Sequence, residues 1–309
     1  MTLDLSTRLG QLRLRNPLMS ASGTFGHGME MRHFVPPGSL GAWVSKTVTP
    51  RPRHGNPAPR IRETEAGFLN SIGLENRGLD AYIEQVIPTL AGLETVIVTN
   101  IGGERPEAFV EAAERLAGFA ELGAFEVNLS CPNVDGGKLP FATDPPVAEA
   151  IIAGVRAVTD KPVFAKLSPN VTRIGEMAAA VEAGGADGVT AVNTLLGMQV
   201  DWRTGRPGLN TRVGGYSGPA IKPVALRCAF ECVQAVSIPV IGCGGIASAD
   251  DVLEFLAVGC RAVQVGTASF SDPGLLRRLP AELAAKLEQA GFGSLEDVIG
   301  IVDRVPALT

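Results

Sequence analysis

The 309-residue sequence has few cysteines, histidines and aromatic residues, and it has no excess of positive charge. It contains 27 lysines and arginines against 32 aspartates and glutamates, which gives a formal net charge of −5. Without a dense basic run, there is no electrostatic case for a nucleic-acid partner or an anionic membrane surface. No window approaches ~20 uninterrupted apolar residues, and the amino-terminal segment lacks the apolar stretch of a signal or an anchor. We therefore expect a cytoplasmic protein that does not cross a membrane.

The cysteines and histidines show no pattern typical of a metal site or a disulfide framework. The five cysteines are an odd number, and none forms a CxxC pair. Cys228 and Cys232 are four residues apart on an expected helix, which suits either a metal pair or two buried side chains. With no further ligand nearby, we favour burial. The three histidines, His27, His33 and His54, share no metal-ligand spacing, so we expect no metal.

Two common nucleotide-binding fingerprints are also missing. No GxGxxG follows an expected strand and opens a helix, and no GxxxxGK[ST] occurs. NAD and ATP therefore lack their usual signatures in this sequence.

The sequence does contain short β-branched runs that alternate with Ala/Leu/Glu-rich helical segments. Because the runs are apolar throughout, they predict a parallel sheet covered by helices. Eight of them predict a (β/α)8 barrel in a single domain, residues 1–309, with an open doubly wound sheet as the alternative. The expected strands are 17–21, 42–47, 95–100, 124–130, 162–167, 188–193, 238–243 and 262–266. The expected helices are 105–121, 146–159, 173–184, 219–236 and 248–258.

Further segments shape this expected barrel. Residues 1–15 predict a short β-hairpin before it, and 48–76 and 195–218 are long Gly/Pro-rich connections. We expect these long βα loops to lie over the carboxyl-terminal face, where long loops are often functional. Ser248 predicts the start of a helix, and Gly259 predicts its end.

The carboxyl-terminal ends of the expected strands are unusually polar. A buried lysine or asparagine needs a partner, and in barrels of this kind the chemistry lies at this end. Repeated at successive strand ends, such residues favour a shared polar ligand over isolated structural groups. The ends read Ser20-Ala21-Ser22, Ser45-Lys46-Thr47, Thr99-Asn100, Asn128-Leu129-Ser130-Cys131, Lys166-Leu167-Ser168 and Asn193-Thr194.

Small residues follow the last two expected strands. Gly244 and Gly245 come after the seventh strand, Gly266 and Thr267 come after the eighth, and Gly218 precedes an expected helix. Loops after strands seven and eight are a frequent phosphate site of this fold, assisted by helix N-termini. With a strand-end lysine nearby, these residues predict a phosphorylated cofactor.

At this point the motifs resemble those of a known family. They are "NPLMSASGTFGHG", "SKTVTPRPRHGNPAPRI", "FLNSIGLENRGL", "NLSCPNV", "AKLSPNVTRI", "VNTLLGM", "GGYSGPAIKPVAL", "IPVIGCGGIASADDVLEFLAVGC" and "VQVGTASFSDP", and they run from residue 16 to 273. Together they resemble dihydroorotate dehydrogenase, the FMN enzyme of pyrimidine biosynthesis. "NTLLGM" and "SGPAIKPVAL" are similar to class 1B, whose catalytic subunit works with an iron–sulfur flavoprotein and NAD.

Other readings remain open beside class 1B. They are a fumarate-using class 1A homodimer, a related FMN dihydropyrimidine oxidoreductase, and a barrel that has lost catalysis. The intact polar strand ends disfavour the last of these. The membrane-associated class has an added amino-terminal segment and a serine base, and we expect neither in this chain.

The resemblance implies specific roles and partners. Cys131 would be the catalytic base that takes a proton from C5 of dihydroorotate, while a hydride leaves C6 for FMN. FAD and a [2Fe-2S] cluster are implied only on a partner subunit, in a heterotetramer built on a homodimer. One FMN per chain would contact Ser22, Lys46, Thr47, Asn100, Asn128, Lys166, Val192, Gly218, Gly244, Gly245, Gly266 and Thr267. Dihydroorotate would contact Lys46, Asn70, Ser71, Ile72, Gly73, Leu74, Asn128, Asn193 and Thr194.

A cysteine base raises the question of how its thiolate forms. A free thiol has a pKa of about 8.5 and is mostly protonated at neutral pH. Lys46 is one candidate source of positive potential, and Lys166 is expected beside the N1/O2 edge of the flavin. Pro132 and the glycine pair 136–137 predict a loop that closes over the substrate. The alternative for Cys131 is a small buried filler.

Overall fold

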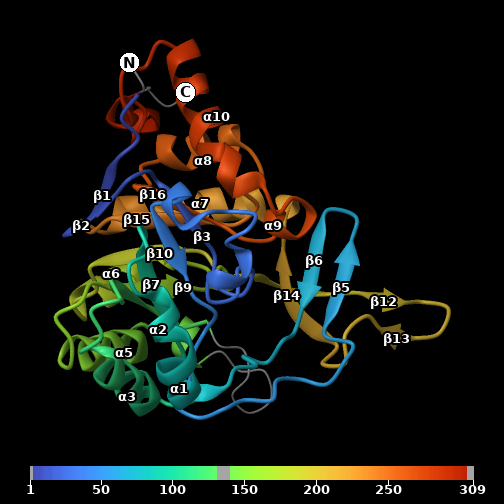
Figure 1. The fold of residues 1–309 in the computed structure, drawn as a ribbon. Coiled ribbons are helices and arrows are strands. Elements are labelled where there is room, and N and C mark those ends of the chain that lie inside the picture. The colour runs from blue at the N-terminus through green and yellow to red at the C-terminus, as the bar shows by residue number, and fades with distance from the viewer. Residues whose placement is uncertain (1–2, 131–139, 305–309) are drawn as a thin grey trace.

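The computed structural model describes residues 3–130 and 140–304, and in it eight parallel strands close into a barrel (Figure 1). The order around the barrel is β10-β15-β16-β3-β4-β7-β8-β9. The predicted (β/α)8 fold is therefore confirmed, and the open sheet is wrong. The strands are β3 (Leu18–Ser20), β4 (Ala42–Val44), β7 (Val96–Ile101), β8 (Ala124–Asn128), β9 (Val163–Leu167), β10 (Gly188–Ala191), β15 (Val240–Cys243) and β16 (Ala262–Val265).

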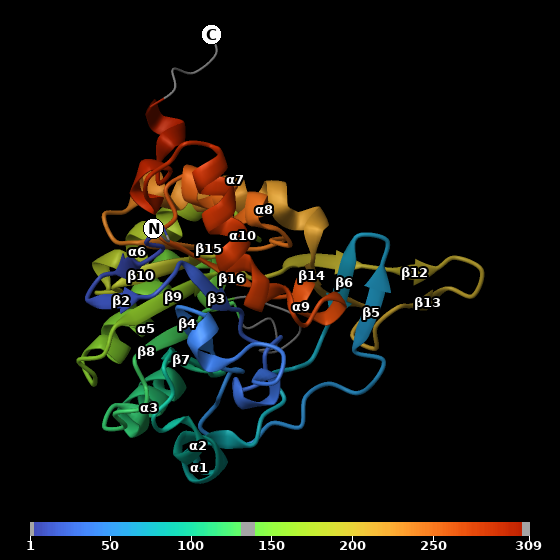
Figure 2. The ribbon, with the colours of Figure 1, turned by 45° about the horizontal axis from the view of Figure 1, so that its top comes forward.

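Helices cover the outside of the barrel, and each predicted helix is present (Figures 1 and 2). These helices are α3 (Pro106–Leu116), α5 (Pro145–Arg156), α6 (Ile174–Ala183), η4 (Pro219–Ile221) continued by α7 (Lys222–Ala235), and α8 (Ala249–Ala257). The sequence analysis did not predict α1 (Gly78–Ala81), η3 (Tyr82–Val86), α2 (Ile87–Leu90), α4 (Pro140–Thr143), α9 (Ala268–Ser271), α10 (Leu275–Gln289) or the short turns η1 (Met29–Met31), η2 (Pro37–Ser39), η5 (Leu295–Asp297) and η6 (Ile301–Arg304).

The predicted ends of α8 are confirmed in the structure. The Ser248 hydroxyl accepts a hydrogen bond from the Asp251 backbone N–H at 3.2 Å, as an N-cap does. Gly259 lies just beyond the helix with φ +107, a conformation that favours glycine.

Apolar side chains fill the end of the barrel that the amino-terminal hairpin covers, opposite the carboxyl-terminal ends of the strands. The predicted amino-terminal hairpin is formed by β1 (Thr7–Leu9) and β2 (Leu12–Leu14). Leu9 and Leu14 of this hairpin pack with Met19, Phe164 and Ile241 in one buried cluster. The hairpin therefore closes one end of the barrel with hydrocarbon and leaves polar chemistry to the other end.

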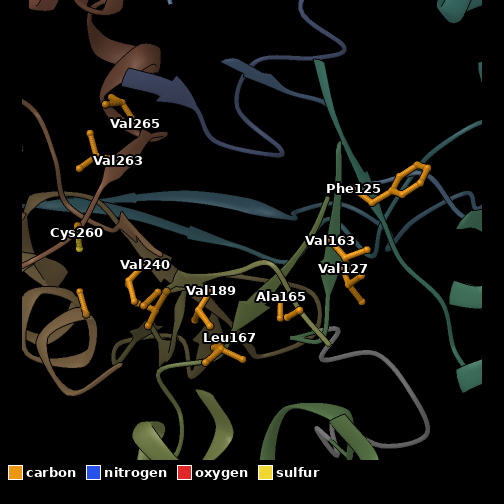
Figure 3. Packing of buried hydrophobic residues seen from close by; sticks show 14 of the residues in the cluster. Phe125, Val127, Val163, Ala165, Leu167, Val189, Val240, Cys260, Val263 and Val265 are labelled. Atoms are coloured by element: carbon orange, nitrogen blue, oxygen red, sulfur yellow. The ribbon is translucent and has the colours of Figure 1, made fainter. Parts of the chain in front are cut away.

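The larger core lies between the barrel and its helices (Figure 3). Phe125 and Val127 of β8 belong to it. Successive side chains of a strand point to opposite faces. The alternate residues of β8, Glu126 and Asn128, therefore point into the barrel.

The two long connections form a second sheet, for which the sequence analysis placed no strands. Its antiparallel strands β11, β14, β6 and β5 stand beside the barrel, and a small hairpin extends outward from them (Figures 1 and 2). The strands are β5 (Ile61–Thr64), β6 (Gly67–Asn70), β11 (Leu195–Met198) and β14 (Val213–Ser217), and the hairpin is β12 (Val200–Asp201) with β13 (Arg206–Pro207).

Within the described ranges 3–130 and 140–304, no helix combines the length and the hydrophobicity that crossing a bilayer requires.

Candidate active site

A cavity of about 910 Å³ lies at the carboxyl-terminal ends of the barrel strands, beside the second sheet. The structure brings together here every described residue that the resemblance assigned to cofactor or substrate. They are Ser22, Lys46, Thr47, Asn70, Ser71, Ile72, Gly73, Leu74, Asn100, Asn128, Lys166, Val192, Asn193, Thr194, Gly218, Gly244, Gly245, Gly266 and Thr267. Their individual binding roles stay predictions. Cys131 lies outside the described residues, while Asn128 and Ser130 just before it line the cavity.

Lys166 forms part of the cavity floor and is held from below. Its side chain is only 6% exposed, and its ammonium donates to Gln264 Oε1 at 3.0 Å and lies 3.7 Å from Glu126 Oε1. Burial alone would lower the pKa of this lysine, but the carboxylate of Glu126 and, more weakly, the Cys243 thiolate form favour the charged state. The net shift of the Lys166 pKa is upward, so the floor of the cavity carries a positive charge at neutral pH.

A row of hydrogen-bonded side chains runs from the floor toward the cavity wall. Thr47 Oγ1 donates to Asn100 Oδ1 at 2.6 Å, and Asn128 Nδ2 lies 3.5 Å from Thr47 Oγ1. Asn193 Nδ2 then donates to Asn128 Oδ1 at 3.2 Å. The row joins the ends of four different strands or strand-end loops, so it fixes their amides relative to one another.

Two glycines after β15 leave room for an anion. Gly244 has φ +132 and Gly245 has φ +77, a region that side-chain-bearing residues rarely adopt. A Cβ on Gly245 would stand 2.7 Å from the Lys222 backbone nitrogen. Thr267, which follows β16, donates its hydroxyl to Ser217 at 2.9 Å on the same side of the cavity. The backbone can therefore approach a phosphate closely here.

Comparison with known proteins identifies the family of this chain. The family model for dihydroorotate dehydrogenase matches residues 4–287, most of its length. The chain belongs to the dihydroorotate dehydrogenase family.

Two relatives agree with this family, and a solved structure agrees with the fold. A protein of Trichlorobacter lovleyi is 47% identical over 299 residues, covering 97% of this chain and 98% of its own. One of Geobacillus kaustophilus is 48% identical over 296 residues, covering 96% and 95%. Both are named dihydroorotate dehydrogenase B (NAD(+)), catalytic subunit. The dihydroorotate dehydrogenase of Eimeria tenella, solved with ferulenol, matches with a TM-score of 0.81 over 98% of this chain and 89% of its own, at 24% identity, which supports the fold alone.

Residues 70–74, which the resemblance assigned to dihydroorotate, lie at and just beyond the end of β6 and line the cavity. Gly73 has φ +75, and Leu74 adopts φ +53, a left-handed conformation that is strained for leucine. Asn56 Nδ2 donates to Ser71 Oγ at 2.8 Å and to its carbonyl oxygen, which fixes the turn. Specific contacts therefore hold this turn at the cavity wall.

Lys46 is the other cation of the cavity, and its surroundings differ from those of Lys166. It follows β4 and lines the cavity. Within residues 3–130 and 140–304, no hydrogen-bond or ion-pair partner contacts its ammonium. A cation that nothing in these two ranges pairs with suits an anionic ligand.

The cysteines outside the cavity are structural. Cys228 and Cys232 lie on α7 in the main core with Cys260, which agrees with the predicted burial. Burial raises the pKa of each of these thiols. Within the described part of the chain, no group of three or more His, Cys, Asp or Glu side chains is placed to hold a metal ion.

Two polar residues beneath the cavity were missed by the sequence analysis. Glu126 and Gln264 are 0% and 1% exposed, and they form the hydrogen bonds that support Lys166 and Asn100. A signal existed for Glu126, because it stands two residues before Asn128 in a strand and must share its face.

Proposed function

We propose that this chain is the FMN-binding catalytic subunit of a dihydroorotate dehydrogenase linked to NAD, acting in pyrimidine biosynthesis. It would oxidise dihydroorotate to orotate. One observation carries the proposal: a single cavity joins a glycine cradle, a buried ammonium and a row of fixed amides. The names of the relatives support the substrate and the acceptor.

The residues of the cavity fit FMN. The volume of about 910 Å³ suits a flavin together with a small ring, since ligand pockets reach about 1,000 Å³. The phosphate would rest against the backbone of Gly218, Gly244, Gly245, Gly266 and Thr267. Lys166 would face the pyrimidine edge of the flavin ring, where its charge favours the reduced state. When bound, FMN supplies a hydride acceptor.

The opposite part of the cavity fits a flat, polar, anionic substrate. Asn128 and Asn193 offer both donors and acceptors, which suits the ring amides of dihydroorotate. Lys46 would pair with its carboxylate, and the backbone of 70–74 together with Thr194 would complete the contacts. Held in this way, the substrate presents one face to the flavin.

The proton removed from C5 needs a base, and Cys131 is the residue we assign. Cys131→Ser should slow flavin reduction by dihydroorotate by about two to four orders of magnitude, the range of general-base contributions, while FMN stays bound. Wild-type flavin reduction should accelerate as the pH rises toward about 8.5, as a thiol base requires. Rapid reduction in the serine variant would remove Cys131 from this role.

The electrons must then leave the flavin, and we assign this step to a partner. The sequence shows no dinucleotide fingerprint, and the relatives are named catalytic subunits, which supports a separate partner. We propose a partner subunit that carries FAD and a [2Fe-2S] cluster, in a heterotetramer built on a homodimer. The purified chain should reduce artificial dyes but not NAD, and NAD reduction by the chain alone would overturn the partner requirement.

The decisive test mixes the purified chain, loaded with FMN, with dihydroorotate in the absence of oxygen. Bleaching of the flavin absorption band is the expected result. Bleaching by a dihydrouracil-type compound but not by dihydroorotate would transfer the proposal to a related pyrimidine oxidoreductase. A protein that does not take up FMN would overturn the proposal. The single domain of residues 1–309 and the cytoplasmic location remain parts of the proposal.

A further inference from the structure

Glu126 is a buried carboxylate in the middle of the barrel, and the proposed reaction does not use it. Its side chain is 0% exposed, and it lies one layer below the cavity. A buried carboxylate is costly unless hydrogen bonds and an opposite charge compensate for the lost water.

Four groups from four other strands converge on this carboxylate. Asn100 Nδ2 donates to Oε1 at 2.7 Å, and Thr190 Oγ1 donates to Oε2 at 2.9 Å. Gln264 Nε2 also donates to Oε2, and the Lys166 ammonium lies 3.7 Å from Oε1. The carboxylate thus accepts three hydrogen bonds and has one ammonium close by.

This arrangement fixes the position of the Lys166 ammonium. An ionised carboxylate only accepts hydrogen bonds, so the Gln264 amide must turn its nitrogen toward Glu126. The Gln264 oxygen then faces Lys166 and accepts from its ammonium at 3.0 Å. Glu126 thus acts on the lysine twice, through charge and through the orientation of an amide.

The same constraint propagates toward the cavity. Asn100 turns its side-chain nitrogen toward Glu126. Its side-chain oxygen therefore faces Thr47 and accepts a hydrogen bond from the Thr47 hydroxyl. Because the Thr47 hydroxyl donates to Asn100, its oxygen accepts from Asn128 Nδ2 and from the Ser22 hydroxyl, each at 3.5 Å. One buried carboxylate therefore sets the direction of a row of donors and acceptors.

We propose that Glu126 is a positioning residue that fixes the place and charge of Lys166 and the donor direction of the Asn100–Thr47 row at the flavin site. The inference rests on the proposed FMN function. Two titratable groups, Glu126 on β8 and Cys243 on β15, act on the lysine. Burial lowers its pKa and the Glu126 charge raises it, so without Glu126 the ammonium would lose its proton at lower pH.

The test measures the affinity of apoprotein for FMN by flavin fluorescence quenching between pH 7 and 9. Wild type should bind with an affinity that is constant over this window, because Lys166 stays charged. Glu126→Gln should bind about tenfold or more weakly at pH 7, which is the size of one lost charge-assisted contact, and should weaken further toward pH 9.

Two controls separate positioning from mere packing. Thr190→Val removes a hydrogen bond to the same carboxylate but leaves its charge, and Thr190 does not line the cavity. It should bind FMN within about threefold of wild type, with no pH dependence, because the charge of Glu126 and its contacts with Lys166, Gln264 and Asn100 remain. Lys166→Met should bind weakly at every pH, and adding Glu126→Gln to it should bring no new pH dependence.

The outcomes distinguish the two proposals. Failure of wild type to bind FMN at all would overturn the proposed function. If Glu126→Gln binds FMN with the same affinity and the same pH profile as wild type, only the role of Glu126 is overturned. If Glu126→Gln does not fold, wild type alone still decides: an FMN affinity that falls between pH 7 and 9 would mean that the lysine is not held charged.

Discussion

Replacing Gly245 by alanine should separate the anion cradle from the rest of the fold. The residue has φ +77, and an added Cβ would lie 2.7 Å from the Lys222 backbone nitrogen and 2.8 Å from its Cα. Backbone atoms cannot move aside as a flexible side chain can. The start of α7, with the Gly218 turn before it, would have to shift away from the β15 loop.

The magnitude follows from two separable costs. A side chain at positive φ costs roughly 1–2 kcal/mol. Overpacking against backbone adds typically 1–3 kcal/mol. Gly92→Ala is a matched control, because Gly92 has φ +74 with no atom within 4 Å of an added Cβ. Gly92 is also not among the residues that line the cavity. The control should show only the first cost.

The assay combines apoprotein unfolding in urea with FMN titration. Gly245→Ala should be less stable than Gly92→Ala by about 1–3 kcal/mol, which is the overpacking cost alone. Its FMN dissociation constant should rise by about 10- to 150-fold, since one charge-assisted backbone contact to phosphate contributes about 1.5–3 kcal/mol. Gly92→Ala should bind FMN as wild type does. Equal FMN affinity in both variants would refute the cradle.

Two further predictions concern charges. Lys46→Met should raise the dissociation constant of orotate by about 10- to 100-fold, the size of a lost charge-assisted bond, measured as a shift of the flavin spectrum. Its apoprotein should unfold at nearly the wild-type temperature, and a large loss of stability would contradict an ammonium that has no partner within residues 3–130 and 140–304. The Asp251 carboxylate accepts a hydrogen bond from Lys222 Nζ at 2.6 Å. Burial raises the pKa of this carboxyl, but its hydrogen bonds, first of all the one from Lys222, together lower the pKa by more than burial raises it. The net shift of the Asp251 pKa is therefore downward. A carboxyl with a lowered pKa in the folded state stabilises the fold at pH values above its unfolded-state pKa, near 3.9. This stabilisation is lost as the pH falls through the pKa of the folded state. Asp251→Asn should therefore be less stable than wild type at pH 7, with a difference in unfolding free energy that narrows below about pH 4. A difference that stays constant down to pH 3 would contradict this.

The barrel could be predicted because its strands are buried on both faces. A run such as Val163–Leu167 is apolar for that reason, apart from the inward lysine. Strand ends were harder to place. The predicted strand 42–47 ends at Val44 in the structure. Ser45 still donates its backbone N–H to Val98 O at 2.9 Å, and Lys46 and Thr47 after it line the cavity. The last helix, α10, was missed although its leucines recur with helical spacing, and its internal Pro280 weakens that signal.

The second sheet could not be predicted from local pattern. β14 reads "VGGYS", and its glycines favour a loop over a strand. Its neighbour β6 lies far away in the sequence, with Gly215 opposite Asn70. Such a pairing depends on tertiary contacts that no window of the sequence contains.

The candidate site was accessible from sequence because two regularities combine. Inward residues of a strand recur at every second position, about 6.6 Å apart along the strand. On β8 this gives Ala124 in the apolar floor, Glu126 in the middle and Asn128 at the cavity; on β9 it gives Phe164 and then Lys166. The barrel interior thus changes from hydrocarbon to ions to ligand contacts in successive layers. Among these inward strand side chains, substitutions in the lowest layer, such as Phe164, should change stability alone, and those in the top layer, such as Asn128, should change ligand affinity alone. Of the three layers of side chains, only the charged pair Glu126 and Lys166 in the middle should change both, because no solvent replaces a lost charge partner there.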